Sequence, residues 1–344
     1  MESPSNKSKE IYMNIVKRVS FIVSLCLMAV MSTSVLADTV RLKLAGTLPA
    51  KHFGNAIIED MVKEIEAANV DLKVKFFPAS QLGSGEELIE DAVRGNIDIV
   101  QAFVYAQADP RLEITNLPGL VTSFEDLVAT FGDPNSNYSK LMTEILNDLG
   151  LVYITSAGEG LVGIVAEKRP VDHAGFGDKG MNIRVWSSDL AKQTVESIGY
   201  RTTTMNWAEV LPALQSGVID GAICCTPEWA YNTFTIAGVG KYFVPVNANV
   251  EATAFYGSQK TWDKLNQAQK DVLETAIRKA SKTIMAKAWE RSQGFVDKMK
   301  EAGWEILDYT PSERAAMVKH IKSTVWPSVA STIGQETMDK LVAE

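Results

Sequence analysis

The fold class is decided by three stretches of sequence: VRLKL (residues 40–44), LKVKFF (72–77) and IDIVQAF (97–103). The first alternates apolar and polar side chains, as a strand with one buried face does. Apolar residues at helical spacing fill residues 55–67, and a capping-box sequence at Ser84 opens a second helix before the third stretch. The order strand, helix, strand, helix, strand predicts an α/β fold with a doubly wound, parallel sheet.

The same alternation restarts in the second half of the chain. We expect strands at 182–186 and 218–224, with helices at 188–198 and 207–215. A single helical pattern then runs over residues 267–302. At 1.5 Å per residue this helix would span roughly 54 Å, which is long enough to run along both lobes of a two-lobed protein and tie them together.

The first 37 residues are predicted to be a cleaved export signal. Lys17 and Arg18 precede an apolar stretch over residues 21–31, and a small-x-small cleavage pattern ends at Ala37. The apolar stretch is shorter than the ~20 residues that a membrane-spanning helix needs. We therefore expect a periplasmic protein that starts after about residue 37.

Charge and cysteine content exclude several classes of protein. Removal of residues 1–37 takes away four basic and two acidic residues and changes the net charge from −8 to −10. An acidic exported chain has no electrostatic reason to bind nucleic acid or an anionic membrane. The mature chain keeps Cys224 and Cys225. Because a ring closed between adjacent cysteines is strained, we expect two free thiols and no disulfide framework.

Four groups of residues resemble the DctP family of TRAP (tripartite, ATP-independent) solute-binding proteins. They are FPASQLG (77–83), followed by an acidic helix and GNID (95–98); MNIRV (181–185); WAEV (207–210) with ALQSGVIDG (213–221); and WDKL (262–265). Their order and spacing, more than any one of them, carry the resemblance. It covers nearly the whole mature chain.

The resemblance implies a two-lobed periplasmic-binding-protein fold, with crossing strands as the hinge and the long helix spanning both lobes. Lobe I is expected to contain residues 38–158 and about 250–285, and lobe II residues 159–249 and about 286–344. Ligand would enter the cleft between the lobes, which close around it. The closed protein, a monomer, would then dock on the TRAP membrane permease subunits.

Arg184 is the strongest candidate for a ligand-binding residue. A guanidinium in the middle of a strand is costly unless an anion pairs with it, and its planar fork holds a carboxylate through two parallel hydrogen bonds. The resemblance places the family's ligand-clamping arginine at this position. The alternative partner is an aspartate or glutamate of the chain itself.

The sequence also departs from the family's acid-binding pattern. Many members carry a second arginine at the position of Val162. An asparagine often found after the 213–221 stretch is replaced near Cys224, Cys225 or Thr226, and a position near Phe103 that is polar in some acid-sugar binders is aromatic. These losses argue against a sialic-acid-like or doubly charged ligand, because a second buried carboxylate without a partner carries a heavy desolvation cost.

The other candidates are mostly aromatic residues, for which ordinary core packing is the alternative to a place in the cleft. Glu159 either receives an ammonium group or is a solvated loop residue. The predicted ligand-binding residues are Arg184, Trp207, Trp186, Phe103, Glu159, Thr47, Cys224, Thr226, Trp229 and Phe255. We therefore expect a small organic acid as ligand, either a monocarboxylate with a hydrophobic or aromatic body or a zwitterion whose cation meets Glu159.

Two other functions fit an exported α/β protein. A sensor that signals to a membrane receptor would use the same ligand-driven closure, and the sequence does not separate it from transport. A hydrolase or lyase is disfavoured, because His52, His173 and His320 show no metal-ligand spacing and the chain has neither a Gly-x-Ser-x-Gly nucleophile elbow nor a phosphate-binding glycine loop. We predict a non-enzymatic transport protein without cofactor or metal.

Overall fold

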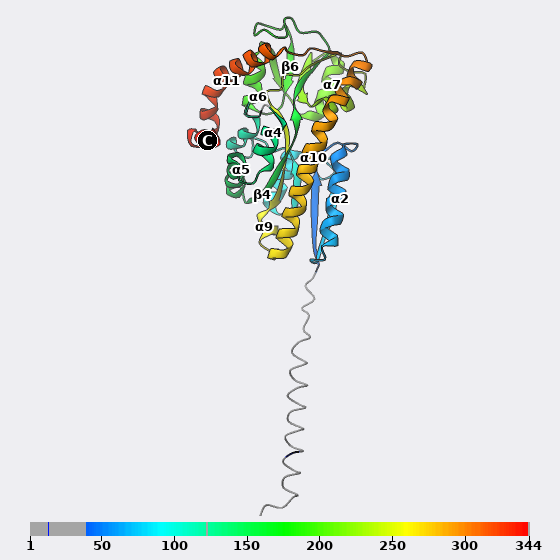
Figure 1. Cartoon of the computed structure of the whole chain (residues 1–344), viewed down its shortest axis with the longest axis vertical. Helices are drawn as coiled ribbons and strands as arrows, with labels where there is room; N and C mark the ends of the chain where they lie inside the picture. Colours follow the sequence, from blue (N-terminus) through cyan, green and yellow to red (C-terminus); the bar gives the residue numbers. More distant parts are fainter. Residues whose placement is uncertain (1–12, 14–38, 122, 343–344) are drawn as a thin grey trace, which may run out of the picture. The chain divides into compact units, whose positions relative to one another are not determined.

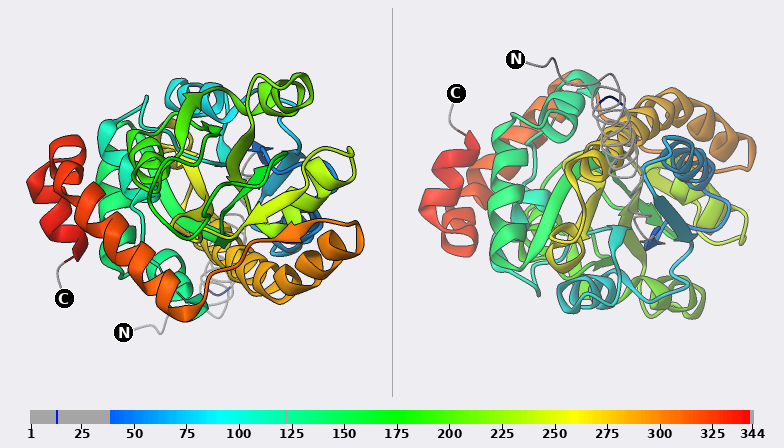
Figure 2. Two further views of the ribbon diagram at one scale, coloured as in Figure 1. Left: turned by 90° about the horizontal axis from the view of Figure 1, so that it is seen from above. Right: turned by 90° about the horizontal axis from the view of Figure 1, so that it is seen from below.

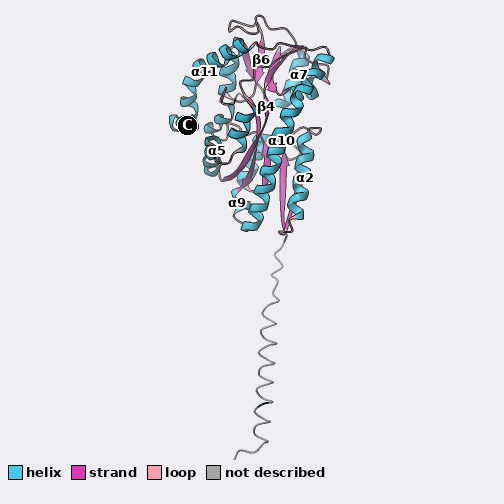
Figure 3. Cartoon of the chain, viewed as in Figure 1, coloured by secondary structure: helices cyan, strands magenta, loops and turns pink. Residues whose placement is uncertain are grey.

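A computed structural model describes residues 13, 39–121 and 123–342 of the chain. Apart from Met13, the predicted export signal and its cleavage point after Ala37 lie outside the described residues. Val40–Glu344 form a compact unit of their own, whose strands build two separate sheets (Figure 3). None of the described helices is both long and apolar enough to cross a membrane.

The first sheet has five strands in the order β2-β1-β3-β10-β4. Their bounds are β1 (Val40–Gly46), β2 (Leu72–Phe77), β3 (Ile99–Ala102), β4 (Leu151–Leu161) and β10 (Val250–Ser258). Strand β1 pairs in parallel with β2 and β3, the three strands that the opening stretches of sequence predict. Strand β10 runs antiparallel to both β3 and β4, so the sheet is mixed.

Local sequence signals set the ends of the helices around this sheet. Ser84 and Glu87 form the predicted capping box, and Gly95 ends the same helix at a φ of 83°, which glycine adopts without a Cβ penalty. The His52 side chain caps the preceding helix by accepting a hydrogen bond from the backbone N–H of Gly54. The helices and turns are α2 (Phe53–Ala67), α3 (Gly85–Arg94), η1 (Pro110–Asn116), α4 (Phe124–Leu127), η2 (Val128–Gly132), α5 (Asn137–Asp148) and α9 (Gln259–Trp262).

The second sheet has six strands in the order β11-β9-β5-β8-β6-β7. Their bounds are β5 (Gly163–Ala166), β6 (Asn182–Val185), β7 (Arg201–Thr204), β8 (Gly221–Cys225), β9 (Tyr242–Val244) and β11 (Glu305–Ile306). Strand β6 is parallel to β7 and β8, and β5 is antiparallel to β8 and β9. The connecting helices are α6 (Asp189–Ser197), α7 (Trp207–Ser216), α8 (Pro227–Ala230) and η3 (Tyr231–Thr235).

The chain passes between the sheets at three places. Strand β4 of the first sheet leads into β5 of the second, β9 leads back into β10, and α10 (Gln267–Glu301) leads from the first sheet towards β11. Helix α10 contacts α2 and β4 as well as α8 and β11, and Figure 1 shows it running along both sheets. The predicted two-lobed α/β fold, with a long helix bracing it, is confirmed.

Two helices follow the long one. Helix α11 (Pro311–Ile333) packs against α6 and η1, whereas α12 (Gln335–Val342) packs against α5. Figure 2 shows α12 beside α5, on the side of the unit away from α2. The C-terminal helices therefore reach back to the first sheet. The proposed lobe boundaries at residues 158, 249 and 285 stay a prediction.

Apolar side chains of both sheets are buried in one core. Leu44 and Ile99 of the first sheet and Ile164 and Ile183 of the second are 0% exposed. A side chain of this size contributes about 1.5–3 kcal/mol when fully buried. Polar and aromatic side chains lie near the carboxyl ends of β3, β6 and β8.

Candidate ligand-binding site

Arg184 lies on β6 and is only 4% exposed. Its Nε donates a hydrogen bond to the carbonyl oxygen of Met205 at 2.9 Å, and its guanidinium carbon lies 5.9 Å from the ring centre of Trp207. The guanidinium forms no ion pair with any residue of 39–121 or 123–342, so the alternative of an internal acid is not realised among them. A buried cation without an anion is unfavourable and leaves its terminal nitrogens free to hold a carboxylate.

Burial lowers the pKa of Arg184 to about 10. Tyr105 and Glu86, which belong to the first lobe, counteract part of this shift, so both lie within electrostatic range of the guanidinium. Tyr105 in turn lies over the start of α3, where its ring approaches Gly85. Arg184 of the second sheet is therefore within electrostatic range of α3 and of the segment that follows β3 in the first sheet.

A row of aromatic rings extends from Arg184. The ring centres of Trp207 and Trp229 are 6.1 Å apart, and those of Trp229 and Phe103 are 6.3 Å apart, both in edge-on arrangements. Phe234 packs beside this row, with its ring centre 5.9 Å from that of Trp207. Trp207 is 39% exposed, whereas Trp229 is buried. The structure thus brings together Arg184 and three of the predicted aromatic residues.

Three other predicted residues have contacts within the chain. The indole N–H of Trp186 donates to the Asn116 side chain at 3.1 Å, which ties β6 to η1. Thr47 is half-buried, and its hydroxyl lies 3.5 Å from the carbonyl oxygen of Gln101. Phe255 is 0% exposed in the core of the first sheet, so it offers no surface to a ligand in this arrangement.

Glu159 is not a solvated loop residue, so that alternative is wrong. It is 4% exposed and lies in β4, which continues to residue 161. Its Oε2 atom lies 2.9 Å from Nε2 of His52 and accepts a hydrogen bond from the indole N–H of Trp229 at 3.4 Å. The carboxylate is therefore joined to both lobes, because His52 precedes α2 and Trp229 lies in α8.

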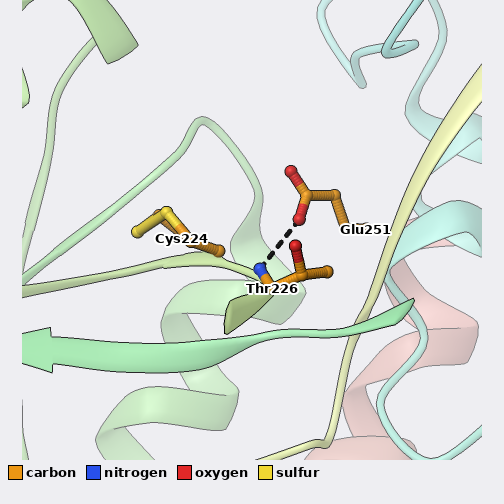
Figure 4. The surroundings of a disulfide bond; sticks show 4 residues. Cys224, Thr226 and Glu251 are labelled. Carbon is orange, nitrogen blue, oxygen red and sulfur yellow. Dashed lines mark hydrogen bonds between the residues drawn. A yellow bond between two sulfur atoms is a disulfide. The ribbon is translucent and has the colours of Figure 1, made fainter. Parts of the chain in front are cut away.

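Thr226 lies beside this carboxylate rather than beside Arg184. Its backbone N–H donates to Glu251 at 2.8 Å, and the residue is 4% exposed (Figure 4). Its side chain closely approaches Gly160, where a Cβ would lie 3.2 Å from the Thr226 methyl group. The predicted site residues thus form two groups, one around Arg184 and one around Glu159.

A family model described as "Bacterial extracellular solute-binding protein, family 7", or DctP, matches residues 45–331. The chain belongs to the DctP family. The predicted membership among TRAP solute-binding proteins is confirmed, and the description supports a location outside the cytoplasm.

Individual relatives of this DctP-family protein are distant in sequence but similar over most of their length. The C4-dicarboxylate-binding periplasmic protein DctP of Rhodobacter capsulatus is 25% identical, over 90% of this chain and 92% of the relative. A TRAP periplasmic solute-binding protein from Sulfurospirillum deleyianum with bound succinate has a TM-score of 0.76 at 20% identity, with 89% and 99% of the two chains covered. DctP7 of Bordetella pertussis, a solute receptor binding pyroglutamic acid, has a TM-score of 0.76 at 19% identity, with 88% and 99% covered.

Cys224 and Cys225 form a disulfide, so the prediction of two free thiols is wrong (Figure 4). The pairing of β8 with β5 slips at this point: Gly163 faces Cys225 and Ile164 faces Ile223, which leaves Cys224 without a partner in the ladder. Such a bulge re-aims a side chain that regular alternation would send to the opposite face. An exported protein also meets oxidising conditions. The bond joins neighbours in sequence and therefore holds no distant segments together.

The sequence analysis did not predict two acidic residues that lie near Glu159, namely Glu228 and Glu251. Glu251 is 3% exposed in β10, and Glu228 of α8 binds Arg291 of α10 through two hydrogen bonds of 2.9 and 2.6 Å. A signal for Glu251 exists, since it is the one charged residue within the otherwise apolar and neutral strand VEATAFYGS. The sequence analysis treats His52 only as a possible metal ligand and does not predict that it caps α2.

Proposed function

We propose that this protein captures a small monocarboxylate with a hydrophobic or aromatic body and delivers it to the membrane permease subunits of a TRAP transporter. The observation that carries the proposal is Arg184, a buried guanidinium with free terminal nitrogens beside the ring of Trp207. One unpaired cation matches one carboxylate. The neighbouring rings match an apolar body.

The opposite charged region favours a monocarboxylate over a zwitterion. Glu159 is 4% exposed, and the cavity beside it measures about 10 Å³, which leaves no room for the ammonium group of a ligand. Val162, at the position of the second arginine of many family members, is 2% exposed and apolar, which leaves a second ligand carboxylate without a cation there. The ligands named for the three relatives above are all organic acids, which supports the acid class.

The test is a thermal-shift screen of the chain from residue 38 onward, unfolded and refolded to remove carried-over ligand. Aliphatic, aromatic, dicarboxylic, sugar-acid and amino-acid ligands are compared. A ligand present at 100 times its dissociation constant adds about 2.7 kcal/mol, which raises the melting temperature by a few degrees. We expect a monocarboxylate to give the largest shift.

Two variants assign the shift to the guanidinium. Arg184→Ala should abolish it, whereas Arg169→Ala should not, because Arg169 is an exposed arginine of the same lobe paired with Glu305 at 2.8 Å. Tight binding of a dicarboxylate without any binding of monocarboxylates would contradict the ligand class. An unchanged shift in Arg184→Ala would contradict the clamp itself.

A further inference from the structure

The two strands that cross between the lobes place two acids side by side. Glu251 of β10 faces Gly160 of β4, but the next residue, Ala252, faces Gly158. The slip makes Glu159 an extra residue in β4, directly beside the Gly160–Glu251 pair. Both glutamates are at most 4% exposed. A bulge of this kind bends the strand and redirects a side chain, here at the position where the chain leaves the first sheet.

Glu159 is under-supplied with hydrogen bonds. Its Oε1 atom is buried and has no partner among the described residues. At Oε2, the indole N–H of Trp229 is distant at 3.4 Å, and Nε2 of His52 is close at 2.9 Å but poorly aligned. Nδ1 of His52 accepts the N–H of Gly54 at 3.2 Å, so the ring N–H that points at Glu159 is on Nε2.

Among the described residues, the arginine of this cluster pairs with a different carboxylate. Arg291 of α10 binds Glu228 of α8 with two hydrogen bonds, which neutralises that carboxylate. The charged and titratable groups around the Glu159–Glu251 pair are thus His52 before α2, Glu228 on α8 and Arg291 on α10, while the backbone N–H of Thr226 donates to Glu251. Within residues 39–121 and 123–342, no lysine or arginine pairs with either Glu159 or Glu251. Burial, followed by the charge of Glu159, raises the pKa of Glu251 well above its usual range.

The cluster also leaves room for little solvent. A cavity of about 10 Å³ lies between Glu159, Thr226 and Glu228 and the α10 residues Ala288 and Ser292. That is space for about one water molecule, which cannot solvate two charged carboxylates. Two adjacent buried acids in such a site do not both ionise.

We propose that Glu159 and Glu251 bind one proton when the two lobes meet around them, so that ligand capture by this protein takes up a proton. Glu159 contacts His52 from the first lobe and Trp229 from the second, so opening of the lobes separates these contacts and admits water. In the open form both acids ionise and the proton is released. The coupling rests on the proposed ligand-driven closure, but the shared proton itself does not.

The sign of the linkage follows from the raised pKa of Glu251. Its ordinary value is 4.5, so an unfolded chain has lost this proton at pH 6. The folded chain keeps the proton to higher pH than the unfolded chain, so folding is favoured by low pH until the raised pKa is passed. Each unit of pH in this window should lower the equilibrium constant for folding up to tenfold. By the same argument, the dissociation constant for ligand should rise with pH.

The first experiment needs no ligand. Urea unfolding of the refolded chain is measured from pH 5.5 to 8.5 for the wild type, Glu251→Gln, Glu159→Gln and the control Glu301→Gln, an exposed residue of α10. Glutamine imitates the protonated acid, so Glu251→Gln should unfold with a weaker pH dependence and gain stability over the wild type as pH rises. Glu159→Gln should also flatten the profile, and it serves if Glu251→Gln does not fold. Identical slopes in all four proteins would overturn the proposal.

The second experiment measures the coupling to ligand. Calorimetric titration with the acid selected in the thermal-shift screen, in two buffers of different ionisation enthalpy at pH 7, gives the number of protons exchanged. We expect an uptake approaching one proton for the wild type and the Glu301→Gln control, and close to none for Glu251→Gln. No uptake by a wild type that binds the acid would contradict the coupling. Failure to bind any acid would instead contradict the proposed function, while the unfolding profiles still decide on the shared proton.

Discussion

Arg184 and Glu159 are buried to the same extent, at 4% exposed each, but their surroundings differ in kind. Arg184 has no anion among the described residues and lies against Trp207. Glu159 has hydrogen-bond donors from both lobes around it and a second acid, Glu251, beside it. An isolated buried cation is best relieved by an anion that comes from outside, whereas crowded acids relieve one another by keeping a proton.

The two regions are connected through the aromatic row. Trp207 contacts the guanidinium at one end, and Trp229 donates to Glu159 at the other, with their ring centres 6.1 Å apart. When the two lobes close, the surroundings of Arg184 and Glu159 should therefore change together. The comparison therefore predicts that ligand is bound at the cationic end and that protons are exchanged at the acidic end.

The largest effect is expected from substitution of Arg291, the cation that pairs with Glu228 near Glu159 and Glu251. Arg291→Met leaves the buried carboxylate of Glu228 without its partner. Breaking a buried pair from one side costs about 3–5 kcal/mol, and because the Arg291 side chain is 41% exposed we expect about 3 kcal/mol less free energy of unfolding at pH 7.5. Urea unfolding measures it. The control Arg169→Met breaks an exposed pair and should change the value by no more than ~0.5 kcal/mol. Equal losses of unfolding free energy in the two variants would show that the Glu228–Arg291 pair contributes no more than an exposed pair does.

A smaller effect of opposite sign is expected at the cationic end. Burial lowers the pKa of Arg184 to about 10, and a depression of that size corresponds to about 3 kcal/mol of unfavourable desolvation. Arg184→Met removes this cost but also loses the hydrogen bond to the Met205 carbonyl, worth about 1 kcal/mol. The ligand-free variant should therefore gain about 2 kcal/mol in urea unfolding while it loses acid binding. A loss of stability would show that the guanidinium has an internal structural role instead.

The elements that could be predicted from the sequence are those whose signals lie within a few residues. The predicted capping box of Ser84 and Glu87 fixes the start of α3 locally and is confirmed, and the left-handed Gly95 fixes the end of this helix. Helix α11 was not predicted, although its buried residues recur every fourth position. They are Met317, Ile321, Val325, Val329 and Ile333. Pro327 inside the helix interrupts the pattern that a helical reading relies on.

The parts that escaped prediction depend on pairing between distant strands. The bulge beside Cys224 arises from the register of β8 against β5, and no local pattern reveals it. The burial of Glu159 depends on His52, more than a hundred residues earlier in the sequence. For the same reason, sequence reasoning found the cation at Arg184, which a motif marks, but not the acid cluster, which only the crossing of β4 and β10 assembles.

The most direct test of the central claim compares a ligand with and without its charge. The monocarboxylic acid that gives the largest thermal shift and its primary amide have nearly the same shape, and both are titrated calorimetrically into the refolded wild type at pH 7. If Arg184 clamps a carboxylate, the amide should bind at least 100-fold more weakly, since truncating one partner of a buried charge pair costs about 2–5 kcal/mol. Equal affinities for acid and amide would contradict the clamp and with it the assignment of Arg184 as the ligand anchor.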